Sequence, residues 1–230
     1  MRFAKICSVL LAAMLLTSCA AAKDRSADTV RERGALRIAV QESEQLYELS
    51  EFIAESIGVK PEYIQTDKDA ALRMLSDGSA DAAVGYYAKN DNPGLDYSMT
   101  IPFYSERVYA VCRSDEYYTA LSELTGKLLG ADSDLFYSVE RQIMFESANG
   151  VLYCSAPDTA VEMLKNDELD AFLCLESKAL ELISENEGIN CCVMPDIESE
   201  EYCVVLSKGD TQLYGALNGA IGKYLTEETK

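Results

Sequence analysis

The residues that could do chemistry in this chain are few, and the missing types exclude several reaction classes. The chain has no histidine, so the commonest general base and metal ligand is absent. A catalytic cysteine–histidine pair is therefore excluded, and no Cys-x-x-Cys spacing indicates a zinc site. We expect no metal, no cofactor and no catalytic residue, and hence a protein that is not an enzyme.

The eight cysteines suggest packing rather than catalysis. Cys7 lies in an apolar N-terminal run, and Cys19 follows that run. The other six lie in apolar, strand-like segments; they are Cys112, Cys154, Cys174, Cys191, Cys192 and Cys203. One or two disulfides remain an alternative in an exported protein. Their position within apolar runs favours buried thiols that act as small hydrophobic side chains.

Residues 1–18 have the features of an export signal. Two cations precede an apolar run over residues 6–16, which is shorter than the ~18–20 residues that span a bilayer. The following segment LTSC, which ends at Cys19, resembles the bacterial lipobox; an ordinary cleavage site is the alternative. We expect a signal peptide over 1–18, lipidation of Cys19, a tether over 19–33, and anchoring to the outer face of the bacterial cell membrane.

Composition and charge describe a folded, acidic protein. The chain has 230 residues, of which 48% are hydrophobic and 26% charged, as in globular proteins of one large or two small domains. Acidic residues number 39 and basic residues 20, for a net charge of -19. Nucleic-acid binding rests on Lys and Arg that neutralise phosphates, so we expect no nucleic-acid partner.

A helix–turn–strand unit occurs twice, at an offset of 89 residues. The segment ALRMLSDGSADAAVG begins at Ala71, and AVEMLKNDELDAFLC begins at Ala160. Apolar residues three and four apart predict a helix in each copy, and an Asp-Ala pair opens an apolar strand after a polar turn. We expect the two copies to be structurally equivalent, one in each of two lobes.

The flanking patterns extend each copy to alternating strands and helices. The expected strands are 36–40, 61–65, 82–85, 152–154, 171–174 and 202–206, with a strand-like segment within 101–113. The expected helices include one ended by Gly58, one capped by Thr66 or Asp67, one from 133 to about 145, one with Pro157 in its first turn, and one over 212–225. This alternation predicts α/β lobes with parallel sheets covered by helices, and ligands bind beyond the carboxyl ends of such strands.

Five segments, in order, carry a family resemblance: VRERGALRIAV, ALRMLSDGSADAAVG, LDYSMTIPFYSERVYAV, LTGKLLGADS and YCVVLSKGDTQLYGALNGAI. Together they resemble the bacterial extracellular solute-binding proteins of family 3. The resemblance implies an α/β, two-lobed type 2 periplasmic-binding-protein-like fold, each lobe a mainly parallel sheet flanked by helices, joined by two crossing strands. Lobe 1 would be 34–106 plus 203–230, and lobe 2 would be 107–202.

The resemblance also implies a function. The chain would be the substrate-binding lipoprotein of an ABC importer, a monomer that captures a small polar solute in an interlobe cleft. The solute would be an amino acid or an amino-acid-like molecule, and the partner would be an ABC permease in the membrane. A sensor or interaction lipoprotein on the same fold is the alternative, and a dehydratase-like enzyme is a distant third.

Family binding residues carry over unevenly. Ser133 matches a Ser or Thr that binds the ligand carboxylate at a helix N-terminus, although it can also serve as a helix cap alone. Glu176 matches the acid that holds the ligand ammonium group, or is an exposed acid. Tyr86 and Tyr87 follow Gly85, where the resemblance places a cleft wall; packing within the lobe is their other role.

The expected carboxylate clamp is missing. The family arginine would precede the segment that begins at Asp96, but no arginine lies between Arg73 and Arg107, and Lys89 is the sole cation there. A lysine is a point charge rather than a fork, and it can equally be solvated. Glu42, at the end of the first strand, is a further cleft candidate. Without the clamp, and with a shortened lid, we expect weak affinity for ordinary α-amino acids.

Overall fold

A computed structural model describes residues 26–90, 96–132, 135, 151–154 and 156–228. The chain is divided into two compact units. Unit 1 lies within Met1–Gly85, Pro93–Ile101 and Val204–Lys230, and unit 2 lies within Tyr86–Asn92 and Pro102–Cys203. Each unit is described by itself.

The described helices are α2 (Ser26–Arg33), α3 (Glu44–Ser56), α4 (Lys68–Asp77), α6 (Pro157–Lys165), α7 (Glu176–Glu185) and α8 (Thr211–Glu228), together with a short 3-10 turn, η1 (Leu121–Leu124). The described strands are β1 (Ala35–Val40), β2 (Lys60–Gln65), β3 (Ala82–Ala88), β4 (Tyr97–Glu106), β5 (Val108–Arg113), β6 (Leu129–Asp132), β7 (Val151–Cys154), β8 (Ala171–Leu175), β9 (Ile189–Val193) and β10 (Glu200–Ser207). The strands form two five-stranded sheets, ordered β2-β1-β3-β10-β4 and β7-β6-β8-β5-β9. This confirms the predicted α/β class.

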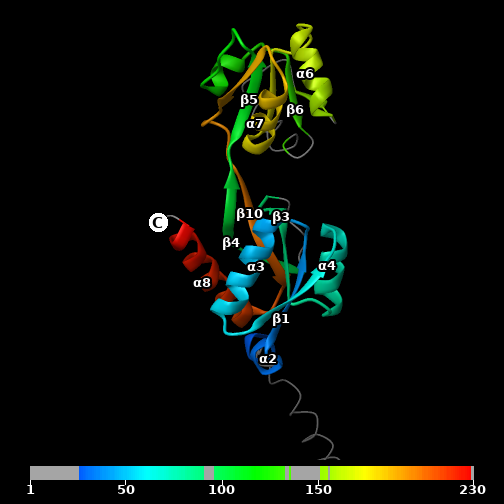
Figure 1. Cartoon of the computed structure of the whole chain (residues 1–230), viewed down its shortest axis with the longest axis vertical. Coiled ribbons are helices and arrows are strands. Elements are labelled where there is room, and N and C mark those ends of the chain that lie inside the picture. Colours follow the sequence, from blue (N-terminus) through cyan, green and yellow to red (C-terminus); the bar gives the residue numbers. More distant parts are fainter. Residues whose placement is uncertain (1–25, 91–95, 133–134, 136–150, 155, 229–230) are drawn as a thin grey trace, which may run out of the picture. The chain divides into compact units, whose positions relative to one another are not determined.

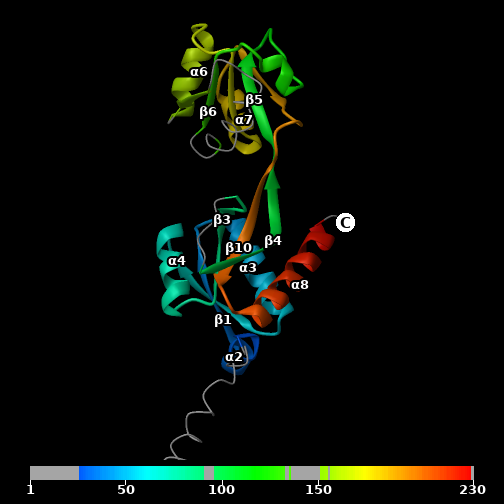
Figure 2. The same cartoon turned by 180° about the vertical axis from the view of Figure 1, so that it is seen from behind.

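In the first sheet, β1 pairs in parallel with both β2 and β3. Its strand β1 is almost fully buried, as expected of a central parallel strand. Helix α3 packs on this sheet beside α8, and Figures 1 and 2 show the two helices together from both sides. Strands β4 and β10 each contribute residues to both units, since the unit boundaries fall at Ile101/Pro102 and Cys203/Val204.

The second sheet is more mixed than the sequence predicts. Strand β6 pairs in parallel with β7 and β8, but β5 pairs antiparallel with β8 and with β9. Alternate side chains of β8 face opposite layers: Phe172 packs with α6 and α7, whereas Leu173 packs with η1 and Met194. The core of unit 2 therefore lies on both faces of its sheet.

Local signals at the ends of the elements explain why the predicted helices form. The Asp67 carboxylate accepts a hydrogen bond of 2.7 Å from the backbone N–H of Ala70, so Asp67 is the N-cap of α4. Gly58 follows α3 with a φ of 82°, the left-handed conformation that ends many helices. Pro157 is in the first turn of α6.

The predicted repeat is confirmed. The units α4–β3 and α6–β8 are each a helix followed by a strand, and β3 and β8 belong to different sheets. Gly78 and Asp167, 89 residues apart, both adopt a positive φ, of 74° and 60°. Near the end of the turn, the backbone N–H of Ala80 donates to the Met74 carbonyl in the first copy, and that of Leu169 donates to the Met163 carbonyl in the second.

The aspartate that opens the strand has the same role in both copies. The Asp81 carboxylate accepts the backbone N–H of Arg37 at 2.8 Å, and the Asp170 carboxylate accepts that of Leu128 at 2.7 Å. In return, the backbone N–H of Asp81 donates to the Arg37 carbonyl, and that of Asp170 donates to the Leu128 carbonyl. These paired bonds fix the start of β3 beside β1 and the start of β8 beside β6.

The predicted tether over 19–33 is wrong for its second part. Residues Ser26–Arg33 form helix α2, in which Ala27 and Val30 are buried. Helix α2 packs against α8, and the Ser26 hydroxyl accepts the backbone N–H of Leu213 at 3.1 Å. Eight residues are too few to show a clear apolar periodicity, and the helix that α2 packs against is far away in the sequence. The sequence pattern therefore did not predict α2.

The six cysteines outside the signal region are free thiols, and all except Cys191 are buried. This confirms the predicted packing role and removes the disulfide alternative in the structure. Burial, with a further contribution from Cys192, raises the pKa of the Cys112 thiol to about 12, so this thiol is protonated at neutral pH. Among the described residues, no helix is both long and apolar enough to cross a membrane.

Candidate functional site

The predicted site residues divide between the two units. Glu42 and Gly85 belong to unit 1; Tyr86, Tyr87, Lys89 and Glu176 belong to unit 2; Ser133 lies outside the described residues. Glu42 is exposed after β1 and accepts a hydrogen bond of 2.9 Å from the Gln65 side chain. Gly85 is buried within β3.

Tyr86 belongs to a cluster of three tyrosines in unit 2, which we call the tyrosine cluster: Tyr86, Tyr104 and Tyr202. The rings of Tyr104 and Tyr202 are stacked, with centroids 6.0 Å apart. The Tyr86 ring meets both rings edge to face, at 6.5 and 5.3 Å, an arrangement that aromatic quadrupoles favour. Three strand ends, those of β3, β4 and β10, supply these rings.

Tyr87 does not share this cluster. It follows Tyr86 directly in β3, and successive strand residues point to opposite faces. Its side chain is buried, with 4% of its surface exposed. Tyr87 therefore packs inside the protein while Tyr86, which is half-buried, joins the tyrosine cluster.

Glu176 is bound by an arginine of the same unit. The Arg107 Nε and Nη2 groups donate to the two Glu176 carboxylate oxygens at 3.1 and 2.5 Å. The Tyr109 hydroxyl donates to Glu176 Oε1 at 2.9 Å, and the Arg107 guanidinium lies 5.6 Å from the centre of the Tyr109 ring. Hydrogen bonding from Arg107 lowers the pKa of Glu176, so Glu176 is ionised at neutral pH.

A second carboxylate lies at the start of the same helix. Glu176 is the first residue of α7, and the Glu106 side chain, 7% exposed, accepts the backbone N–H of Ser177 at 2.8 Å. Glu106 thus occupies the positive end of the α7 dipole. An anionic ligand group would not find that helix end free.

The tyrosine cluster and the Arg107–Glu176 pair are neighbours. Burial raises the pKa of the Tyr104 hydroxyl, and the Glu106 carboxylate, Tyr86 and the Glu176 carboxylate raise it further. Tyr104 and Glu106 belong to strand β4, and Arg107 directly follows its last residue. The described part of unit 2 therefore gathers aromatic rings, two carboxylates and one guanidinium.

Lys89, the cation nearest to the missing clamp position, is paired with a carboxylate of the same unit. Its ammonium group forms an ion pair with Glu201, 2.5 Å from the Oε2 atom, and the hydrogen bond to Glu201 raises its pKa. Both side chains are well exposed, at 55% and 40%, so the pair is screened by water and weak.

Sequence reasoning missed five residues of this arrangement: Tyr104, Glu106, Arg107, Tyr109 and Tyr202. Four of them lie within 101–113, where the sequence pattern predicts only a strand-like segment. A signal was available, because Tyr104, Glu106 and the exposed Arg107 interrupt an apolar segment at alternating and adjacent positions. Polar residues in an otherwise apolar stretch are candidates for a site.

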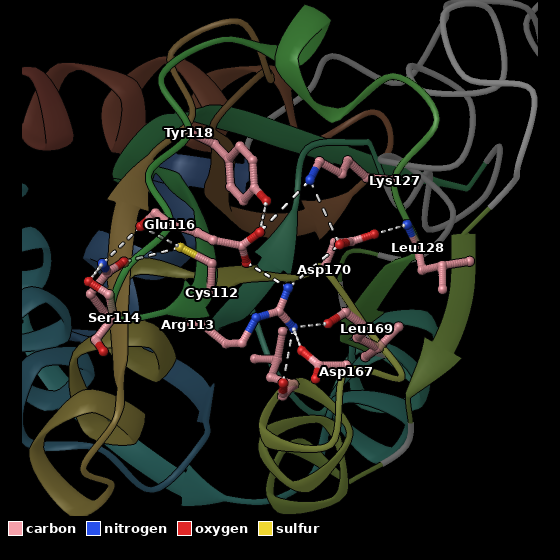
Figure 3. Close-up of polar contacts among 12 residues, drawn as sticks. Cys112, Arg113, Ser114, Glu116, Tyr118, Lys127, Leu128, Asp167, Leu169 and Asp170 are labelled. Carbon is pink, nitrogen blue, oxygen red and sulfur yellow. Dashed lines mark hydrogen bonds and ion pairs between the residues drawn. The ribbon is translucent and has the colours of Figure 1, made fainter.

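A dense polar network among the described residues of unit 2 lies at the end of β8 opposite to Glu176 (Figure 3). The Arg113 side chain, 22% exposed, donates to the carbonyls of Leu164 and Leu169 at 3.0 and 2.8 Å. It also forms ion pairs with Glu116, Asp167 and Asp170, at 2.8, 3.3 and 3.5 Å. Because its polar groups satisfy the turn between α6 and β8, we assign this network to structure rather than to ligand binding.

Neither a cavity in unit 1 nor a metal-binding cluster offers a second candidate site among the described residues. A shallow cavity of about 450 Å³ in unit 1 is lined by Ser76, Asp96, Ser207 and Lys208, none of which belongs to the arrangement above. Among the described residues, no cluster of three or more acidic or cysteine side chains could hold a metal ion.

Comparison with known proteins identifies a family. The model of the bacterial extracellular solute-binding proteins, family 3, matches residues 46–229. No curated protein sequence matches. Solved structures share the fold at low identity. YckB from Bacillus subtilis has a TM-score of 0.65 and 16% identity, and the alignment covers 87% of this chain and 88% of that one.

Two further structures describe proteins of stated ligand class. An amino acid ABC transporter substrate-binding protein from Streptococcus pneumoniae, AbpA, bound to L-arginine, has a TM-score of 0.55 and 18% identity, with 87% of this chain and 93% of that chain covered. An ancestral cationic amino acid solute-binding protein has a TM-score of 0.62 and 13% identity, with 89% and 95% covered. The two-sheet α/β fold is thus the type 2 periplasmic-binding fold of these proteins.

Proposed function

Because this chain belongs to the bacterial extracellular solute-binding proteins, family 3, we propose that it is the substrate-binding component of an ABC importer for a small polar solute. The solute is an amino acid or an amino-acid-like molecule. The observation that supports this most is that unit 2 holds both the tyrosine cluster and the Arg107–Glu176 pair, with Tyr104 three residues before Arg107 in the chain. Rings and paired charges together fit a solute with an apolar or delocalised part and a charged head.

Binding alone is the activity in this proposal. A solute that binds one conformation of the protein more tightly than others shifts the population toward it, and the permease recognises that population. No bond of the solute is made or broken by the protein. Arginine is a first candidate, since AbpA and the ancestral protein bind arginine or cationic amino acids, and a guanidinium stacks well on tyrosine faces.

A thermal-shift screen tests the proposal. A solute at one hundred times its Kd stabilises the native state by about 2.7 kcal/mol, which raises Tm by roughly 5–11 °C in a chain of this size. We expect at least one amino acid to do so with the wild type. The Tyr86→Ala variant should lose most of the shift, since it removes a ring that meets two others.

The control is Tyr117→Ala, which removes the same residue type from unit 2 at a position that is 70% exposed. It should keep the full ligand-induced shift. If no amino acid, peptide or organic cation raises Tm, the transport proposal fails and the sensor or interaction role gains support. Equal shifts in both variants would mean that the tyrosine cluster is not in the binding site.

Export and anchoring are part of the proposal. The LTSC segment before and at Cys19 supports cleavage and lipidation there, which would hold the receptor at the outer face of the membrane beside its permease. Metabolic labelling with an alkyne fatty acid should tag the wild type and not Cys19→Ala. Label retained by the variant would contradict lipidation at this residue.

A further inference from the structure

We propose that Cys112 and Cys192 are a redox modification site of unit 2, which a small disulfide compound oxidises to an intrachain disulfide that fastens strand β9 to β5. We call these two residues the thiol pair. Neither belongs to the candidate solute site, and both are free thiols in the structure. The structure thus describes the reduced form of the pair.

Strand pairing brings the two thiols to one face of the second sheet. Strand β5 pairs antiparallel with β9, with Cys112 opposite Asn190 and Ala110 opposite Cys192. Residues two apart on a strand share a face, so the thiols are diagonal neighbours. Both belong to the core cluster on that face, with 0% and 3% of their surfaces exposed. The adjacent Cys191 packs against the core cluster on the opposite face.

One side chain contacts both sulfur atoms. The Asn190 Oδ1 atom lies 3.0 Å from Cys112 Sγ and 3.7 Å from Cys192 Sγ and accepts hydrogen bonds from both thiols. The Asn190 amide group donates to the carbonyls of Glu116 and Ser114, at 2.9 and 3.3 Å, which fixes its orientation. The Cys112 thiol also lies 3.4 Å from the Glu116 carbonyl (Figure 3). A shared, oriented acceptor therefore holds the two thiols side by side.

Oxidation of the thiol pair is a two-electron exchange with the small disulfide. One thiol of the pair loses its proton, and the thiolate attacks a sulfur of the small disulfide and releases the other half of that compound. The second thiolate of the pair then attacks the mixed disulfide and releases the remaining half. The pair gives up two electrons and two protons, and the small disulfide takes them up as two thiols.

The position of β9 provides access to the buried pair. In the order of the described strands, β9 is at the end of its sheet and pairs with β5 alone, so it can separate from one neighbour without disturbing the rest. Burial raises the pKa of the Cys112 thiol, and Cys192 raises it further, so the closed pair contains little reactive thiolate. The exchange therefore proceeds through local opening of the sheet edge.

The disulfide constrains the sheet edge once it forms. Diagonal neighbours have Cα atoms about 7–8 Å apart, whereas a disulfide joins Cα atoms about 4.4–6.8 Å apart, so its closure draws β9 toward β5. The two cysteines are about 80 positions apart in the sequence. A cross-link over such a long loop restricts the unfolded chain and stabilises the folded one. Oxidation should therefore raise Tm.

The test treats the purified, folded wild type with glutathione disulfide and maps the products by mass spectrometry after alkylation of the remaining thiols. We expect a cross-link between the peptides of Cys112 and Cys192 that forms well below Tm and is reversed by dithiothreitol. The Tm of the linked form should exceed that of the reduced form by roughly 4 °C or more.

Two variants serve as test and control. Cys192→Ala removes one member of the pair and should abolish the cross-link and the rise in Tm. Cys174→Ala removes an equally buried thiol from β8, in the core cluster on the opposite face, and should keep both. Mapping of the wild type needs neither variant, so the proposal stays testable if Cys192→Ala fails to fold.

Three results would overturn the modification site: no cross-link in the folded wild type, a cross-link that involves Cys191 instead, or glutathione retained on a single cysteine. A linked form with an unchanged or lower Tm would overturn the claim that the disulfide fastens β9 to β5.

Discussion

Loss of the Arg113 side chain should destabilise unit 2, because this one side chain joins several parts of the unit. Its guanidinium donates to two backbone carbonyls of the α6–β8 turn and pairs with three carboxylates (Figure 3). Arg113→Met keeps most of the aliphatic stem and removes the charge and every donor. The variant therefore isolates the polar contribution of the network.

The magnitude follows from the contacts. Hydrogen bonds from a charged group contribute about 1.5–3 kcal/mol each, and removal of one partner of a largely buried charge cluster costs about 3–5 kcal/mol. The Arg113 side chain retains 22% exposure, so water offsets part of the loss and the lower end applies. We expect a destabilisation of about 3 kcal/mol, which lowers Tm by roughly 6–12 °C.

The assay combines thermal unfolding with hydrogen exchange. Amides of β8 and of the turn before it should exchange faster in Arg113→Met, whereas amides of β1 and β3 in unit 1 should not change. Arg113→Lys should recover only part of the stability, because an ammonium group cannot reach both carbonyls and the carboxylates together. A loss below about 1 kcal/mol, as for an exposed ion pair, would refute the argument that the network supports the turn.

Two further predictions concern backbone and charge. Asp167→Val should lower the free energy of unfolding by about 1–2 kcal/mol, because a β-branched residue at a φ of 60° is strained. Asp167→Gly, which copies Gly78 of the first repeat, should lower it by less than about 1 kcal/mol. Equal Tm values for the two variants would contradict this. Because Arg107 lowers the pKa of Glu176, the pair stabilises the fold above the ordinary glutamate pKa and loses this effect as pH falls through the lowered value. The Tm difference between wild type and Glu176→Gln should therefore be small but present at pH 7, about 2–4 °C at most, and should vanish in strong acid; a difference that grows toward low pH would contradict it.

Elements whose signals are local can be predicted directly from the sequence. The cap at Asp67, the glycine at Gly58 and the proline at Pro157 act within one helical turn, and each does what the sequence predicts. The repeat at an offset of 89 was also visible, because the same local signals recur in the same order. Apolar strands flanked by helices then restricted the fold to α/β lobes, and the ordered family segments gave the two-unit architecture.

Non-local strand pairing determines which of the polar and aromatic residues come into contact. Arg107 and Glu176 are 69 positions apart, and their contact depends on the antiparallel register between β5 and β8, which no local pattern encodes. Helix α2 packs against α8, and its Ser26 accepts a hydrogen bond from Leu213, 187 positions away. Tyr202 contacts Tyr86 because β10, the last strand in the sequence, lies beside β3 in the first sheet. The sequence lists the residues of the candidate site, and non-local strand pairing selects which of them become neighbours.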